Sequence, residues 1–125
     1  MKKLTEVSVS EPRVKLSRTQ RPFRIVFEVK LDNGYEVKDM TKKHISEFHR
    51  FLSDTVYKGL SVLEVDKLYL RKEGLSNAPL IMSNGKELCH YGKARNAFRI
   101  YGYYNADGYF VICRIDGGHE THNVH

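Results

Sequence analysis

Hydrophobic and polar residues alternate in two runs near the end of the chain, on either side of the dipeptide Asp107-Gly108. A period of two is typical of β-strands, and Asp-Gly between two such runs indicates a hairpin turn. If the loop has two residues, Arg99 lies opposite Asp116 and Ile100 lies opposite Ile115. One face of the hairpin is then apolar and would pack on a core. The other face carries two arginines, two tyrosines and a carboxylate, which are Arg99, Tyr101, Tyr103, Arg114 and Asp116.

A further alternating run covers residues 23–31 and ends just before Asn33-Gly34. Because Asn and Gly both tolerate positive φ, this dipeptide favours a tight turn between two strands. The pattern therefore predicts another hairpin, with residues 35–38 as its return strand.

Apolar residues then recur at three- and four-residue spacing, which predicts an amphipathic helix. Thr41 is suited to cap its N-terminus, and the helix would end at about residue 58. Ser61 and Glu64 have the spacing of a capping box, which predicts a second helix to about residue 72, although residues 68–70 also fit a strand. Residues 73–96 contain many turn-forming residues and are expected to form a long connection, with a short strand at residues 80–82.

This order of elements predicts an α+β fold. We expect a single antiparallel sheet built from two β-hairpins, with one or two helices packed on one face. The other face of the sheet would then be at least partly open to solvent or ligand. Residues 23–125 are expected to form one domain. Residues 1–22 are polar and basic, and they fit either a basic N-terminal arm or short edge strands.

The charge of the chain favours a polyanionic partner. Among its 125 residues, 21 are Lys or Arg and 15 are Asp or Glu, which gives a net charge of +6. We therefore expect RNA or DNA as a partner, although many small proteins are basic for solubility alone. No apolar run is long enough to span a bilayer, so no membrane partner is expected.

The two cysteines, Cys89 and Cys113, fit no metal or redox motif. Free thiols indicate a cytoplasmic protein, and Cys113 falls on the predicted apolar face of its strand. The histidines near the chain end match no zinc spacing either, so the sequence predicts no metal site and no cofactor.

The polar face of the terminal hairpin is the first candidate site. Arginine side chains match the geometry of phosphate oxygens, and tyrosine rings stack on unpaired bases. We expect Arg99, Arg114 and Tyr103 to bind nucleic acid there, assisted by Lys93 and Arg95 of the preceding connection. The alternative is a solvated sheet face on which Arg99 and Asp116 form a cross-strand ion pair.

Two histidines are the second candidate site. Cleavage of RNA by its own 2′-hydroxyl needs a proton acceptor and a proton donor, and histidine serves both roles near neutral pH. His90 lies among basic residues, and His119 follows the last strand after Gly117-Gly118. We expect these two to act as an acid/base pair. The alternative is that both are exposed loop residues.

The stretch Phe98-Arg99-Ile100-Tyr101-Gly102, followed by residues 108–112, resembles the last two strands of the RelE-type toxins. These are small microbial ribonucleases with a helix packed on an antiparallel sheet, and the resemblance covers residues 41–119. It implies that Arg99 and Arg114 hold phosphate, that His119 or Tyr101 transfers protons, and that an antitoxin is the partner. The chain differs in opening with a predicted β-hairpin. Its residues 115–119 are also similar to small uncharacterised phage and mobile-element proteins, which implies no activity.

Three functions are therefore left open. The first is a toxin-like, metal-independent endoribonuclease that acts on single-stranded RNA, with His90, His119 and Tyr101 as its catalytic residues. The second is a non-enzymatic binding module, either a nucleic-acid binder or a phage- or defence-related inhibitor that docks on a host protein. The third is a ligand-binding or structural domain whose charge is incidental.

Overall fold

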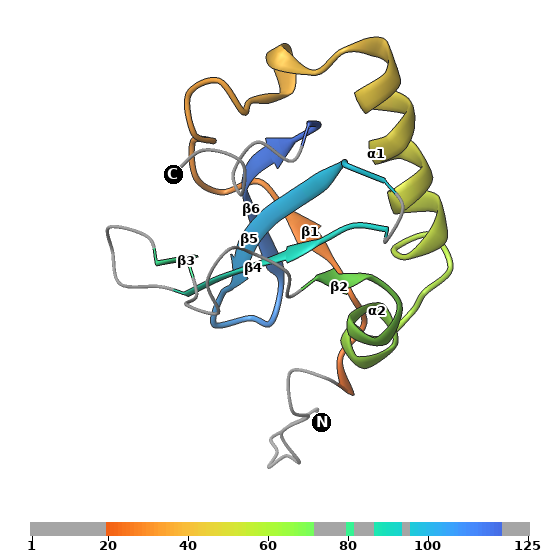
Figure 1. Ribbon diagram of the computed structural model, residues 1–125. Coiled ribbons are helices and arrows are strands. Elements are labelled where there is room, and N and C mark those ends of the chain that lie inside the picture. The colour runs from red at the N-terminus through yellow and green to blue at the C-terminus, as the bar shows by residue number, and fades with distance from the viewer. Residues whose placement is uncertain (1–19, 72–79, 82–86, 94–95, 119–125) are drawn as a thin grey trace, which may run out of the picture.

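A computed structural model describes residues 20–71, 80–81, 87–93 and 96–118 of the chain (Figure 1). The strands are β1 Ile25–Val26, β2 Leu70–Arg71, β3 Leu80–Ile81, β4 Glu87–Tyr91, β5 Arg99–Tyr104 and β6 Phe110–Asp116. The helices are the 3₁₀ helix η2 Val37–Asp39 and the α-helices α1 Lys42–Asp54 and α2 Val62–Tyr69.

The strands form one mixed sheet in the order β1-β6-β5-β4-β2, and β3 also pairs with β4. The pairs β6–β5, β5–β4 and β4–β2 are antiparallel, whereas the pair β1–β6 is parallel. The α+β class is thus confirmed. The prediction of a purely antiparallel sheet is wrong, because β1 pairs in parallel with β6.

The hairpin predicted around Asn33-Gly34 does not form. Asn33 and Gly34 do make a turn, closed by a hydrogen bond of 2.9 Å from the Tyr35 amide to the Asp32 carbonyl, but the chain then enters η2. The residues on either side of this turn lie along the edge of β6 that does not pair with β5. The Phe110 amide donates to the Arg24 carbonyl at 2.8 Å, and the Ile115 amide donates to the Tyr35 carbonyl at 2.9 Å. The alternating pattern therefore marks pairing with a strand far along the chain.

The hairpin of β5 and β6 is confirmed, with a register that changes halfway. Arg99 pairs with Asp116 and Tyr101 with Arg114, as expected, but Gly102 pairs with Ile112. The loop has three residues, 106–108, because the Asn105 amide bonds to the Tyr109 carbonyl at 3.0 Å. This shifts the pairs beside the turn by one position. A β-bulge at the remaining residue, Cys113, restores the expected register.

The bulge also changes the face on which Cys113 lies. The thiol is buried, at 2% exposure, but it packs with Tyr103 and Val111 and not with the main core. The prediction that Cys113 is buried is confirmed, and the predicted face is wrong. β4 is a further difference, because residues 87–91 were expected to belong to the long connection.

The two α-helices begin where the sequence predicts. The Thr41 hydroxyl accepts a hydrogen bond of 3.2 Å from the His44 amide, and the Ser61 hydroxyl accepts one of 3.1 Å from the Glu64 amide. α1 ends at Asp54, four residues before the predicted end, because the backbone of Thr55 leaves the helical region with φ −124° and ψ −76°.

Both helices pack on the same face of the sheet (Figure 1). Phe51 of α1 and Val62 and Val65 of α2 are buried against apolar residues of the central strands, which are Tyr91, Ile100, Phe110, Ile112 and Ile115. No helix in the described ranges has the length and apolar character needed to cross a membrane.

Within this core, the Tyr91 hydroxyl joins α2 to the sheet. It donates to Asp66 at 2.5 Å and lies 2.6 Å from the hydroxyl of Tyr104. Burial, and to a lesser degree the neighbouring Tyr104 and Cys89, raise the pKa of Tyr91 well above its ordinary value.

We expect Tyr91→Phe to lower the free energy of unfolding at neutral pH by about 1–3 kcal/mol, because it leaves two polar partners without this hydroxyl. The raised pKa of Tyr91 also predicts the direction in which the free energy of unfolding changes with pH. Above about pH 10 the unfolded chain releases the phenol proton and the folded chain keeps it, so stability falls by about 1.4 kcal/mol per pH unit for this group. Tyr91→Phe should therefore lose stability less steeply than wild type. Urea denaturation at neutral pH and above about pH 10 measures the free energy of unfolding of each variant, with the exposed Tyr57→Phe as control. Equal slopes for wild type and Tyr91→Phe would contradict the prediction.

Candidate nucleic-acid interface

The register places the predicted polar residues of the sheet on one face. Arg99 lies opposite Asp116, and Tyr101 lies between Arg114 of β6 and His90 of β4. Directly opposed residues in antiparallel strands project to the same side, so the strands bring these groups together. This is the face opposite to the two helices.

The same side chains are buried, which the sequence did not predict. The exposed fraction is 0% for Tyr101, 2% for Arg99 and 7% for Tyr103. A base can stack only on a ring whose face is accessible. The expectation that this sheet face is open to solvent is therefore wrong for these residues, and their binding of nucleic acid stays a prediction.

His90 and Tyr101 are the two predicted catalytic residues that the structure describes, and they lie together. Their rings stack with centroids 4.6 Å apart and planes 15° from parallel. His90 itself is only 7% exposed. Two groups suited to proton transfer thus lie side by side, inside the protein.

Arg99 anchors the connection between β4 and β5. Its guanidinium donates to the backbone carbonyls of Lys93 at 3.1 Å and of Phe98 at 2.8 Å, and it also bonds the carbonyl of Asn96. These bonds hold a turn of main chain beside the strand. The guanidinium N–H groups that make these bonds are ones that a bound phosphate would need.

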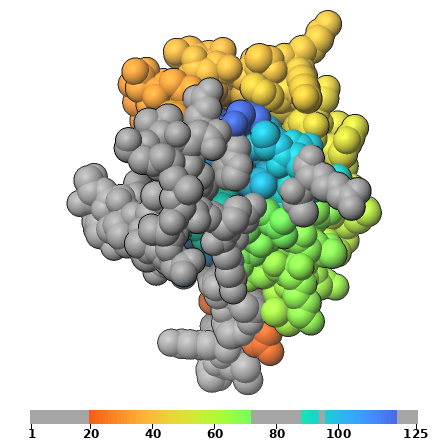
Figure 2. Space-filling view, in the orientation of Figure 1, coloured from red at the N-terminus to blue at the C-terminus, as the bar shows by residue number. Residues whose placement is uncertain are grey.

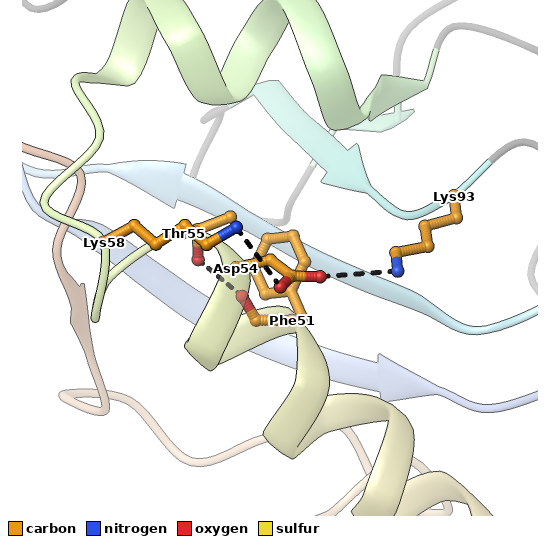
Figure 3. A network of polar contacts seen from close by, with 5 residues as sticks. All are labelled: Phe51, Asp54, Thr55, Lys58 and Lys93. Carbon is orange, nitrogen blue, oxygen red and sulfur yellow. Dashed lines mark hydrogen bonds and ion pairs between the residues drawn. The ribbon is translucent and has the colours of Figure 1, made fainter.

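Lys93 points to the end of α1 and not to the sheet face. Its ammonium lies 3.4 Å from the carboxylate of Asp54, which also receives Lys58 at 3.8 Å (Figure 3). In the same turn, the Thr55 hydroxyl donates to the Phe51 carbonyl at 2.7 Å. The Lys93 ammonium is thus engaged by a carboxylate of α1, and it closes the end of α1 onto the β4–β5 connection.

Arg114 is held by a segment that precedes α1. Its Nε and one terminal nitrogen both lie 2.9 Å from the same Asp32 oxygen, and its guanidinium stacks 4.3 Å from the centre of the Tyr35 ring. The arginine therefore fixes residues 32–35 against β6. His119 and Arg95, the two other predicted site residues, lie outside the described residues.

Two further features of the described residues bear on possible chemistry, a buried thiol and a shallow hollow. Burial raises the pKa of the Cys113 thiol to about 11; Asp32 adds to the shift and Arg114 opposes it, so the thiol is protonated at neutral pH. A shallow hollow is lined by residues that include Tyr35, His44, Asp39 and Asp116. Its acidic lining opposes the binding of phosphate. In the described ranges, no three His, Cys, Asp or Glu residues gather to hold a metal ion.

The exposed face of α1 has the opposite character. Its side chains are three cations, an imidazole, a hydroxyl and one apolar group, and they are Lys42, Lys43, Arg50, His49, Ser46 and Ile45. The two acidic residues of α1, Glu47 and Asp54, are half-buried. Asp54 binds Lys58 and Lys93, and Glu47 lines a hollow beside Lys93. We refer to these six exposed residues as the α1 face.

No ion pair engages the cations of the α1 face within the part of the chain that the structure describes. Lys42 and Lys43 also occupy the first turn of α1, which contains no acidic residue. Cations at a helix N-terminus oppose the helix dipole, at a cost of about 0.3–1 kcal/mol each. The positive potential of this face is therefore concentrated, at some expense of stability.

The sequence contained the signal for this face. The apolar stripe of the predicted helix defines its buried side, and the residues between the stripe positions are the ones that become exposed. The sites predicted from the sequence lie on the terminal strands and the connection before them, and none lies on this helix. In Figure 2 atoms of α1, in yellow, form part of the outer surface.

Comparison of the chain with protein-family models, with curated proteins and with solved structures gave no match. The resemblance to the RelE-type toxins thus stays a prediction.

The contacts of Arg99 predict that its side chain stabilises the folded state. Arg99→Gln removes the buried donors of three backbone carbonyls, and each unsatisfied group costs about 1–3 kcal/mol. We expect the free energy of unfolding to fall by at least about 2 kcal/mol, measured by urea denaturation. Arg24→Gln, which alters an exposed arginine, should change it by less than about 0.5 kcal/mol. A stability of Arg99→Gln equal to that of wild type would show that the anchoring contacts do not matter.

Proposed function

We propose that the protein is a small nucleic-acid-binding module that contacts the phosphate backbone through the α1 face. The observation that carries the proposal is the separation of charge on α1. Lys42, Lys43 and Arg50 are exposed and form no ion pair with any residue that the structure describes, while Asp54 binds Lys58 and Lys93 and Glu47 lines a hollow beside Lys93. Cations arranged in this way attract a polyanion and displace its counterions on binding.

Binding is better supported than cleavage. A catalytic acid or base must reach the scissile phosphate, directly or through one water molecule. His90 and Tyr101 are stacked on each other with almost no exposed surface, and Arg99 is engaged with three carbonyls. The endoribonuclease would need these groups to be uncovered, whereas a binding module needs only the surface of α1.

The surroundings of α1 extend the basic surface. Lys38 precedes the helix with 70% of its side chain exposed, and Lys58 follows it with 63% exposed. Each lies within 4 Å of one carboxylate, so each adds less to the potential than an unpaired cation. The three cations of the α1 face are therefore the residues to test.

Replacing Lys42, Lys43 and Arg50 together by Gln should weaken nucleic-acid binding. Loss of three phosphate contacts lowers affinity by about tenfold to a hundredfold near physiological salt, and it reduces the slope of log K against log salt by about 2–3. Fluorescence anisotropy with labelled oligonucleotides at several salt concentrations measures both quantities. The fold should be preserved, because the substitutions also relieve the repulsion with the helix dipole.

The matched control removes the same charge from other exposed positions, with Arg24, Lys30 and Lys67 replaced together by Gln. We expect this variant to keep most of the affinity and nearly the whole salt slope. Equal losses in the two triple variants would mean that net charge alone drives binding and would overturn the assignment to α1. If wild type binds no nucleic acid at low salt, the proposed function is wrong.

A further inference from the structure

We propose that the nucleic acid is B-form duplex DNA and that α1 lies in its major groove. This inference rests on the proposed function and adds the class of ligand. It differs from the single-stranded RNA that the sequence led us to expect. The shape of the helix, the order of residues across its exposed face and the burial of the aromatic rings support it.

The dimensions of α1 fit the groove. Its 13 residues give a length of about 20 Å, and an α-helix with side chains is about 10–12 Å across. The major groove of B-DNA is about 12 Å wide and admits one α-helix. An A-form RNA duplex has a deep, narrow major groove that side chains do not read. Because α1 packs on the sheet by one side only, its other side is available to enter a groove (Figure 1).

The exposed residues are ordered as a groove requires. Each residue turns about 100° around the helix axis, so Lys42, Ser46 and His49 share the middle of the face. Lys43 and Arg50 lie along one border of it. Groups in the middle of such a helix approach base edges, and groups along the border approach the phosphates of the adjacent strand. Hydroxyl and imidazole groups donate and accept hydrogen bonds, which suits base edges.

Aromatic side chains argue against a single strand as the ligand. Proteins that bind single strands stack the bases on accessible rings. Tyr101 and Tyr103 are buried, and the exposed rings of Phe27, Tyr57 and Tyr109 lie outside the α1 face. Within the α1 face only His49 carries a ring, so the face is better suited to neutralising phosphates than to stacking a run of unpaired bases.

The test compares four labelled probes of one sequence, each about 16 nucleotides or base pairs long, which is one and a half turns of B-DNA. They are duplex DNA, duplex RNA, single-stranded DNA and single-stranded RNA, titrated with the full chain at one salt concentration. We expect duplex DNA to bind at least about tenfold more tightly than the other three. Similar or tighter binding of a single strand or of duplex RNA overturns this inference and leaves the proposed function in place. Binding to none of the four overturns both.

Methylation interference on the duplex identifies the groove. Methyl groups on guanine N7 lie in the major groove, and methyl groups on adenine N3 lie in the minor groove. We expect guanine N7 methylation to reduce binding and adenine N3 methylation to have no effect. The reverse result would overturn the major-groove placement.

A substitution in the middle of the α1 face tests whether α1 is the element that contacts the duplex. Ser46→Asp adds a carboxylate there and should lower affinity for duplex DNA at least about tenfold, by repulsion from the phosphates. Ala106→Asp adds the same charge in the exposed loop between β5 and β6, outside the α1 face, and should lower it less. Thermal unfolding of both variants confirms that they are folded. Folded Ser46→Asp with wild-type affinity overturns the inference.

Discussion

The close approach of β5 and β6 at Gly102 is the constraint on which the rest of the structure depends. A Cβ atom at this position would collide with the carbonyl oxygen of Val111 and with the ring of Phe110. Only glycine therefore allows the two strands to pair here, where the register changes at the bulge. The residues on either side of this point supply most of the apolar face on which both helices pack. The same strands also place Arg99 and Tyr101 on the opposite face, so the core and the buried polar face are set by one backbone arrangement.

The polar residues of the sheet face opposite the helices have a structural role, which their residue types alone do not indicate. Arg99 holds the β4–β5 connection, Arg114 holds the segment before η2, and His90 stacks on Tyr101. Arginine and tyrosine are favoured at nucleic-acid interfaces because their planar groups form directed contacts. The same property makes them suitable for joining segments of main chain inside a small protein. Their presence on a strand therefore indicates directed contacts, and the burial of the strand decides whether the partner is a ligand or the protein itself.

The local parts of the fold could be predicted from the sequence, and the long-range parts could not. The capping residues Thr41 and Ser61 start their helices as predicted, because caps act within one turn. Alternation placed Arg99 and Tyr101 on the correct face of the hairpin, but it carries no information on what covers that face. The pairing of Ile25 with Phe110 was missed for a similar reason: a strand pattern does not identify its neighbour. The bulge at Cys113 depends on a loop one residue longer than Asp-Gly alone suggests.

The parallel pairing of β1 with β6 has a consequence for how the protein is made. Ile25 leaves the ribosome long before Phe110, so the first strand has no partner while the helices and the middle strands are being synthesised. Contacts between residues this far apart in sequence form late and slow the folding of a domain. The sheet edge is completed only when nearly the whole chain has emerged, and a chain that stops before β6 lacks the strand that its own beginning requires.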